Sequence, residues 1–146
     1  MDQQLVLVRG LPGSGKSTFA NYLSQVEGRL HLEADMYWTD EYGNYKFDEE
    51  HIEDAHHWCI SETRKALREG ELVIVSNCFT RPWEMQKYLD LEPNAMIIEC
   101  TGKFESIHGI PNDIFENMQF RFAMKGEILE RYPTVSYEVV KPECYA

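Results

Sequence analysis

The sequence predicts an α/β protein in which a parallel sheet carries a phosphate-binding loop. Residues 10–17, Gly-Leu-Pro-Gly-Ser-Gly-Lys-Ser, fit the pattern G-x-x-x-x-G-K-[S/T]. Around and after this loop, short apolar runs typical of strands alternate with segments that have helical periodicity. Long connections between parallel strands cross over in the right-handed sense, with their helices packed on the sheet. The chain of 146 residues suits a single domain, predicted to span 1–146.

The loop has the sequence context that phosphate binding requires. Leu5–Val8 is an apolar run that predicts a buried strand, and Thr18–Val26 has apolar residues at helical spacing. Glycines let the backbone curl until several N–H groups point at one anion, and the helix N-terminus adds its dipole there. Lys16 is expected to reach the β- and γ-phosphates of a nucleoside triphosphate, and the Ser17 hydroxyl to bind Mg²⁺. The predicted nucleotide-binding residues are Leu11, Pro12, Gly13, Ser14, Gly15, Lys16, Ser17 and Thr18.

The remaining elements follow from apolar periodicity and from capping signals. Further strands are predicted at 29–33, 71–76, 95–100 and 134–140, and helices at about 49–69, 82–91 and 112–123. Gly28 is predicted to cap the first helix, and Thr80 to cap the helix that begins at Pro82. His56 falls on the apolar face of the helix at 49–69, which predicts a hydrogen-bonded core histidine rather than a metal ligand.

Residues 36–47 are aromatic and rich in turn formers, and two interpretations stay open for them. Tyr37, Trp38, Tyr42, Tyr45 and Phe47 surround Gly43-Asn44. They could stack a base or sugar ring at the sheet edge, because aromatic faces accept such rings. Alternatively, they cover the core.

Asp35 is the predicted general base. It follows the strand at 29–33, and ligands of parallel sheets bind beyond the carboxyl ends of the strands. There a carboxylate can accept the proton of a hydroxyl that attacks the γ-phosphate. Glu33 is the second choice for this role, and a turn or helix cap is the structural alternative for Asp35.

The predicted metal site has few acidic ligands. P-loop enzymes usually place a carboxylate at the end of a central strand, but here that strand ends Val75-Ser76-Asn77. Asn77 is therefore the expected oxygen ligand to accompany Ser17. Arg81, Lys103 and Arg121 are the cations available to stabilise charge in the transition state.

Charge and composition limit the kinds of binding partner that are expected. A formal net charge of -11 argues against broad non-specific binding to nucleic acid, although a small basic groove could still take one strand end. The four cysteines show no C-x-x-C spacing, which favours reduced thiols in a cytoplasmic protein. No apolar run approaches the length of a membrane span, so no membrane partner is expected.

Several segments resemble the polynucleotide-kinase-like P-loop kinases. This family includes the kinase domain of phage 5′-polynucleotide kinase and related domains of animal ubiquitin-ligase-binding proteins. The matching segments cover roughly residues 3–125 in the family's order. They are Arg9-Gly-Leu-Pro-Gly-Ser-Gly-Lys-Ser-Thr18, Glu33-Ala-Asp-Met-Tyr37, Ala55-His-His-Trp-Cys59, Val73-Ile-Val-Ser-Asn77 and Ile107-His-Gly-Ile-Pro111.

The resemblance implies an adenylate-kinase-like sheet of order 2-3-1-4-5 with helices on both faces. It also implies ATP, Mg²⁺ and a 5′-hydroxyl acceptor, with Lys16 and Ser17 as phosphate and metal residues and Asp35 as base. His108, in the last matching segment, joins the candidate substrate contacts. The chain departs from the family at Ser76-Asn77, where an Asp is common, and in a short segment at 101–106 that retains Lys103 as its basic residue. Compact proteins of this type occur in phages, which makes the cytoplasm of an infected cell a plausible setting.

Three functions remain open from the sequence. The first is a kinase for the 5′-hydroxyl of a nucleic acid or nucleotide-like acceptor. The second is a kinase for a small molecule, which the acidic charge favours. The third is a nucleotide-binding or slow ATPase module that interacts with a host protein, which the missing acid and the short segment at 101–106 favour. The preference for ATP or GTP also stays open.

Overall fold

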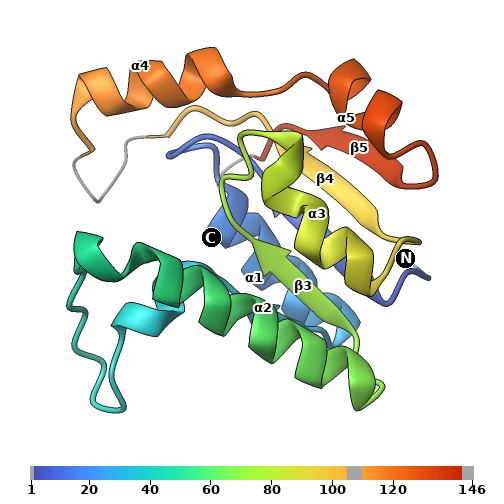
Figure 1. Ribbon diagram of the computed structural model, residues 1–146, viewed down its shortest axis with the longest axis horizontal. Helices are drawn as coiled ribbons and strands as arrows, with labels where there is room; N and C mark the ends of the chain where they lie inside the picture. The colour runs from blue at the N-terminus through green and yellow to red at the C-terminus, as the bar shows by residue number, and fades with distance from the viewer. Residues whose placement is uncertain (1, 105–109, 143–146) are drawn as a thin grey trace.

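The computed structural model describes residues 2–104 and 110–142, and it contains a five-stranded parallel sheet (Figure 1). The strands are β1 (Leu5–Arg9), β2 (Leu30–Leu32), β3 (Val73–Ser76), β4 (Met96–Cys100) and β5 (Ser136–Val140). Their order is β2-β3-β1-β4-β5, which confirms the predicted fold class, a P-loop NTPase with an adenylate-kinase-like parallel sheet. The helices are α1 (Lys16–Glu27), α2 (Ile52–Arg68), α3 (Pro82–Leu91), α4 (Asn112–Arg121) and α5 (Lys125–Arg131), and two 3₁₀ segments are η1 (Ala34–Trp38) and η2 (Glu49–His51).

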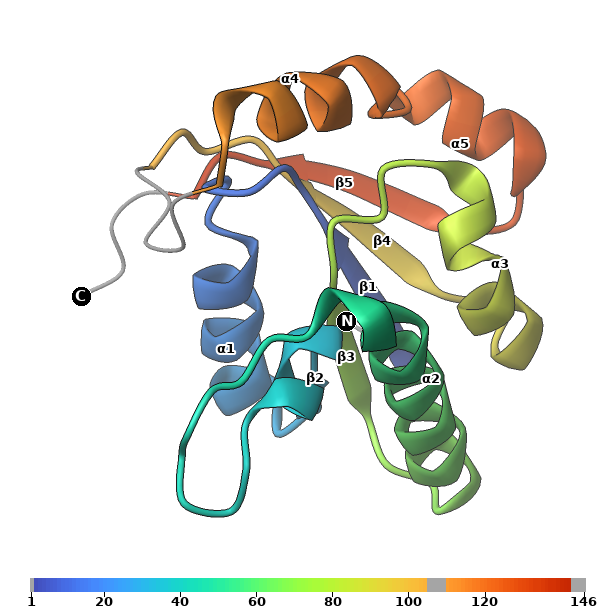
Figure 2. The same cartoon turned by 60° about the vertical axis from the view of Figure 1, so that its left-hand side comes forward.

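The sheet is covered on both faces because its central strands alternate between two cores. Val6 and Val8 of β1 pack with Ala20 and Leu23 of α1. Leu5 and the other odd-numbered residues of β1 face the larger core, which α2, α3 and α5 supply. Both sets of β1 side chains are fully buried, as expected for an inner strand of a parallel sheet. Figure 2 shows α1 on one side of the sheet and α2 and α3 on the other.

Four details differ from the sequence predictions. Gly28 does cap α1 in the left-handed conformation, but the cap of α3 is Arg81, and Thr80 instead bonds Glu84. His56 is exposed rather than buried, because it lies outside the buried stripe of α2, which consists of Ala55, Cys59, Ile60, Thr63 and Ala66. The helix α5 was not predicted from its seven residues, of which Ile128 alone is buried. Residues 34–38 form η1 rather than the start of an extended excursion.

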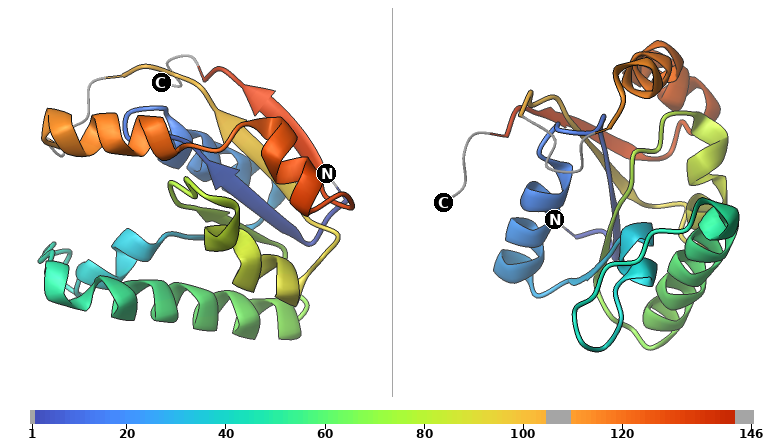
Figure 3. Two further views of the ribbon diagram at one scale, coloured as in Figure 1. Left: turned by 45° about the horizontal axis from the view of Figure 1, so that its top comes forward. Right: turned by 90° about the vertical axis from the view of Figure 1, so that its left-hand side faces the viewer.

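The candidate functional loops all follow the carboxyl ends of strands and therefore lie at one edge of the sheet. The phosphate loop follows β1, η1 follows β2, and the segments at 77–81 and 101–104 follow β3 and β4. Figure 3 (left) shows α4 extending past the end of the β1 arrow at this same edge. None of the ten residues of α4, all within the described part of the chain, is buried. In the described part of the chain, no helix is both long enough and apolar enough to cross a membrane.

Candidate phosphoryl-transfer site

The loop between β1 and α1 forms a tight backbone cradle. Gly13 and Gly15 have φ values of 80° and 87°, a region that favours glycine. A side chain at Gly10 would collide with Ser14 and with the carbonyl of Cys100. The helix α1 begins directly after Gly15, which has no side chain to cap it. The first N–H groups of α1 are therefore available to an anion inside the loop, as phosphate binding requires.

Lys16 lies among the ends of β3 and β4. The pKa of Cys78 is raised, chiefly by burial, and the carboxylates of Glu84 and Asp35 add to the rise. The Lys16 ammonium acts in the opposite direction. Burial also raises the pKa of Cys100, to about 12, against the lowering effect of the same lysine. Cys78 thus has both Lys16 and Asp35 close enough to affect its titration. The structure brings the predicted phosphate residue and the predicted base to one edge of the sheet.

Asp35 is exposed, as a residue that meets a diffusing hydroxyl must be. It occupies the first turn of η1, whose cap residue Glu33 makes no side-chain capping bond. The backbone of η1 is fixed instead by Asn77, whose Oδ1 accepts the N–H of Ala34 at 3.0 Å. The position of Asp35 therefore depends on contacts between β2 and β3 rather than on its own carboxylate.

Glu33 supplies a second carboxylate, beside the P-loop serine. The Ser76 hydroxyl donates to Glu33 Oε1 at 2.6 Å, and His31 Nε2 lies 3.2 Å from the same oxygen. Burial raises the pKa of Glu33, but hydrogen bonds with His31, Ser76 and Ser17 lower it more, so the net shift is below its ordinary value. An ionised carboxylate next to Ser17 can hold a water of a hydrated Mg²⁺ ion. Glu33 thus fits the metal role that the sequence analysis could assign only to Asn77.

Asn77 has structural partners on both sides of its amide. Besides accepting from Ala34, it points Nδ2 toward Cys59 Sγ at 3.9 Å. These contacts connect β3 with η1 and α2. The sequence prediction that Asn77 binds Mg²⁺ stays a prediction, whereas Glu33 is the carboxylate whose pKa is lowered by Ser17. The contact of Glu33 with Ser76 continues the β2–β3 register, in which Leu32 pairs with Val75. This register joins two segments that are distant in the sequence, so neither segment alone predicts the contact.

Arg9 was missed as a functional residue. It is fully buried at the end of β1 and donates to the carbonyls of Phe79 at 3.0 Å and Ala123 at 2.8 Å. It also lies 3.5 Å from Glu99, and its guanidinium is 3.8 Å from the ring centroid of Phe122. Arg9 therefore ties the segment after β3 and the segment after α4 to the phosphate loop. The sequence signal was a lone arginine directly before that loop.

The candidate cations lie in different surroundings. Arg81 forms an ion pair with Glu127 and donates to the carbonyl of Arg121 at 3.0 Å. Arg121 lies 3.5 Å from Glu84, one of the carboxylates near Cys78. Arg81 is thus paired with a carboxylate of α5, while Arg121 is paired with Glu84 of α3. His108 falls outside the described residues.

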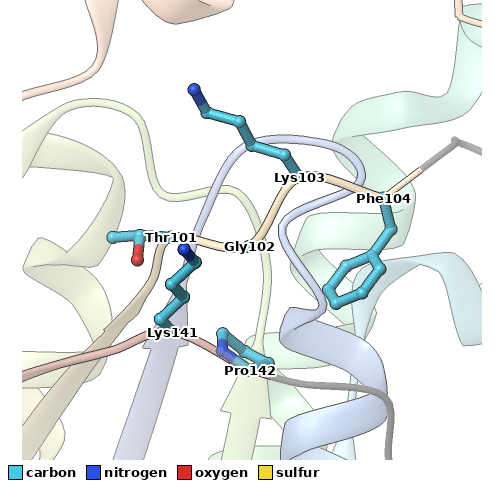
Figure 4. A pocket seen from close by; sticks show the side chains of 6 residues that line it. All are labelled: Thr101, Gly102, Lys103, Phe104, Lys141 and Pro142. Carbon is cyan, nitrogen blue, oxygen red and sulfur yellow. The ribbon is translucent and has the colours of Figure 1, made fainter.

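Lys103 lines a hollow of about 580 Å³ beside the cradle (Figure 4). Its other lining residues are Thr101, Gly102, Phe104, Lys141 and Pro142. The Phe104 N–H donates to the carbonyl of Gly13 at 2.7 Å, and the Gly102 N–H to that of Ser14 at 3.1 Å. Figure 4 shows the Phe104 ring and Pro142 on one side and the two lysines reaching away from them. An aromatic face with flanking ammonium groups suits a nucleoside base next to its phosphates.

Among the described residues, no group of three or more histidine, cysteine, aspartate or glutamate side chains could hold a metal by itself. The acidic partners available to a metal at this edge are single carboxylates: Ser17 contributes to the lowered pKa of Glu33, and Asp35 contributes to the raised pKa of Cys78. This arrangement suits Mg²⁺, which keeps several waters and takes phosphate oxygens as ligands. The site can thus support phosphoryl transfer when the nucleotide supplies the remaining ligands.

Comparison with known proteins identifies the family of the chain. A family model described as an AAA domain (AAA_33) matches residues 5–100. Human NEDD4-binding protein 2 is 36% identical over 90 residues, which are 60% of this chain and 5% of that protein. The chain therefore spans a small part of this curated relative.

Solved structures of kinases share the fold. A sugar kinase from Janibacter sp. HTCC2649 has a TM-score of 0.57 at 16% identity, covering 95% of this chain and 85% of the other. A gluconokinase from Sinorhizobium meliloti 1021 has a TM-score of 0.58 at 15% identity, covering 94% and 83%. The Pnkp1/Rnl/Hen1 complex has a TM-score of 0.55 at 18% identity, covering 77% and 38%. At these identities the likeness shows the fold and leaves the phosphate acceptor undecided.

Proposed function

This chain belongs to the AAA domain family AAA_33, and on that premise we propose that it transfers the γ-phosphate of ATP to a hydroxyl group. The proposed acceptor is the 5′-hydroxyl of a nucleic acid or of a nucleotide-like molecule. The observation that carries this proposal is the position of Asp35, which is exposed just after β2, at the same edge of the sheet where the phosphate loop and Lys16 follow β1.

Each part of the site has a role in this reaction. The backbone of residues 11–18 binds the phosphates, and Lys16 balances charge on the β- and γ-phosphates. Ser17 and Glu33 are the residues that would hold Mg²⁺, which would supply positive charge to balance that of the phosphates. The base of ATP occupies the hollow between Phe104 and Lys141. Arg121, beside Glu84, is the cation placed to approach the transferred group.

Asp35 performs the proton transfer. The acceptor oxygen attacks the γ-phosphorus, the bond from that phosphorus to the β–γ bridging oxygen breaks, and ADP leaves. The acceptor proton passes to the Asp35 carboxylate, which returns it to water after product release. Transfer to water instead of an organic hydroxyl would give a slow ATPase, so the acceptor must be tested against water.

A small-molecule hydroxyl is the second candidate acceptor, and the net charge of -11 favours it. Acidic surface repels the phosphates of a long strand but leaves a neutral sugar unaffected. A sugar kinase and a gluconokinase among the structural neighbours show that the fold accommodates such substrates. The nucleic-acid acceptor is supported by the sequence resemblance and by the fold shared with the Pnkp1 complex.

The test is incubation with γ-labelled ATP, Mg²⁺ and an acceptor panel of 5′-hydroxyl DNA, 5′-hydroxyl RNA, nucleosides, sugars and water alone. We expect label on a 5′-hydroxyl, and a loss of roughly 10²-fold or more in transfer by Asp35→Asn, the scale of losing a general base. Asp90→Asn, at an exposed aspartate near the end of α3, is the matched control. Label on sugars alone would establish the second candidate, and release of phosphate without any acceptor product would refute transfer.

A further inference from the structure

The segment 36–47 folds back on itself and carries exposed tyrosines beside Asp35. Thr39 and Tyr45 form an antiparallel bridge, and the Lys46 N–H donates to the Trp38 carbonyl at 2.9 Å. These contacts place residue 45 opposite residue 39, only four residues after Asp35. Tyr37 and Tyr45 are 40% and 49% exposed, so both offer ring surface to a ligand at this edge. Figure 2 shows this segment as the teal loop that leads from η1 to the start of α2.

The Tyr37 ring packs against two tryptophans, and hydrogen bonds close the tip of the loop that carries Tyr45. The Tyr37 ring centroid lies 5.1 Å from that of buried Trp38 and 6.3 Å from that of Trp58 on α2. At the tip of the loop, Asp40 Oδ1 accepts the N–H groups of Tyr42 at 2.8 Å and Asn44 at 2.9 Å. Burial raises the pKa of Tyr45, and the negative charge of Asp35 adds to the rise. Because the Tyr37 ring is already packed, it loses little side-chain entropy when a second ring stacks on it.

We propose that Tyr37 and Tyr45 form the acceptor subsite, binding the planar base of a nucleoside whose 5′-hydroxyl then meets Asp35. This inference rests on the proposed phosphotransferase function and narrows its acceptor to a molecule with a ring next to the hydroxyl. Stacking on tyrosine is tolerant of base identity, so the subsite selects for a base without selecting a sequence.

Charge limits the subsite to one nucleoside. The acidic residues Asp40, Glu41, Asp48, Glu49 and Glu50 are all exposed in and after the loop. They repel the phosphates of a strand that continued along this surface. The acceptor is therefore the terminal nucleoside of a strand whose other nucleotides extend away from the acidic loop. A nucleoside phosphorylated only at its 3′ position would fit in the same way.

The experiment compares two acceptors and four variants. The acceptors are a short single-stranded 5′-hydroxyl oligonucleotide and the same strand with an abasic first residue. The variants are Tyr37→Ala, Tyr45→Ala, Tyr45→Phe and, as control, Tyr42→Ala, which changes a tyrosine that is 81% exposed at the loop tip. Binding of a nucleoside 3′-monophosphate, with a non-hydrolysable ATP analogue and Mg²⁺ present, is measured by calorimetry alongside transfer.

We expect Tyr45→Ala and Tyr37→Ala each to raise the acceptor KM about 10-fold, the order set by stacking one base, without changing the thermal shift produced by ATP. Tyr45→Phe and Tyr42→Ala should behave like the parent protein, and the abasic strand should be a correspondingly poor acceptor for the parent. Equal KM for the intact and abasic strands would overturn the subsite without involving any variant, so misfolding of an alanine variant does not obscure the result.

The binding measurement separates the two proposals. If no acceptor is phosphorylated but the nucleoside monophosphate binds the parent and binds Tyr45→Ala at least about 10-fold more weakly, the transfer function fails and the subsite stands. If transfer proceeds on sugars as well as on nucleosides, and the tyrosine variants alter neither, the function stands and the subsite is wrong.

Discussion

The proposed donor side and the proposed acceptor side of this site are built in opposite ways. On the donor side, β1, β3 and β4 are almost fully buried, and the phosphate loop grows out of β1. On the acceptor side, residues 39–54 are all exposed and α4 has no buried residue. The donor region is thus fixed by the sheet, while the acceptor region consists of surface segments held by a few contacts. The phosphate-binding loop is constrained by the hydrophobic core, whereas the surface segments that would bind the acceptor can change without disturbing the core.

Arg9 is the link between the two regions. Its buried guanidinium bonds Phe79 and Ala123, so the end of β1 also fixes the chain before α3 and after α4. Glu33 and Asn77 make a similar link between β2 and β3. Four substitutions, ordered from the largest expected effect to the smallest, test how far the two regions depend on each other.

Removing Arg9 should have the largest effect. Arg9→Ala leaves Glu99 without its cation and leaves the buried carbonyls of Phe79 and Ala123 without their donor. We expect the free energy of unfolding to fall by about 3–5 kcal/mol, as for breaking a buried ion pair. Urea unfolding measures it, with Arg64→Ala on the exposed side of α2 as control. A loss no greater than that of the control would mean that the two regions are held together by other contacts.

Lys16→Ala should remove the stabilisation that ATP gives to the donor side while leaving the free protein folded. Ligand that binds only the folded state stabilises it by about 2.7 kcal/mol at a concentration 100 times its Kd. We expect the melting temperature of the parent, but not of the variant, to rise with ATP and Mg²⁺. Lys65→Ala, on exposed α2, provides the control. An unchanged ATP shift in Lys16→Ala would refute the assignment of Lys16 to the phosphates.

Glu33→Gln tests whether the metal is held from β2. We expect the Mg²⁺ concentration for half-maximal ATP turnover to rise about 10-fold or more, the scale for losing an outer-shell partner of a metal. Glu71→Gln, at an exposed position before β3, is the control. An unchanged Mg²⁺ dependence would remove Glu33 from the metal site.

The same variant has a pH signature. Hydrogen bonds keep the pKa of Glu33 below its ordinary value of 4.5 in the folded protein, despite burial. The ionised form therefore stabilises the fold above pH 4.5, and this contribution is lost as the pH falls from there through the lower folded-state pKa. Thermal melts between pH 3 and pH 7 should show a steeper loss at acid pH for the parent than for Glu33→Gln. Parallel curves would indicate that the carboxylate is not stabilised in the fold.

Asn77→Asp should have the smallest effect on the metal. A carboxylate can still accept the Ala34 N–H, but the donor toward Cys59 is lost. We expect a stability loss of about 1 kcal/mol and a smaller change in Mg²⁺ dependence than Glu33→Gln produces. Melting curves and a Mg²⁺ titration measure both. A marked fall in the Mg²⁺ requirement would restore the sequence prediction that Asn77 belongs to the metal site.

The sequence by itself determined the donor side. A phosphate loop is a local backbone motif, so its glycines, Lys16 and Ser17 are readable from adjacent residues together with the strand before it and the helix after it. The parallel sheet followed from alternating apolar runs, and the position of Asp35 followed from the rule that strand ends share an edge. These features need no knowledge of which strands are neighbours.

Only the tertiary structure decided the remainder, because it depends on pairing between distant segments. The β2–β3 register brings Glu33 to Ser76, a pairing 43 residues apart. The reach of Arg9 to Ala123 spans 114 residues, and no local pattern in α4 or α5 anticipates it. Whether Tyr37 and Tyr45 face a ligand or the core was open from the sequence, since aromatic residues serve both purposes. The bridge from Thr39 to Tyr45 and the packing of Trp38 settled their exposure.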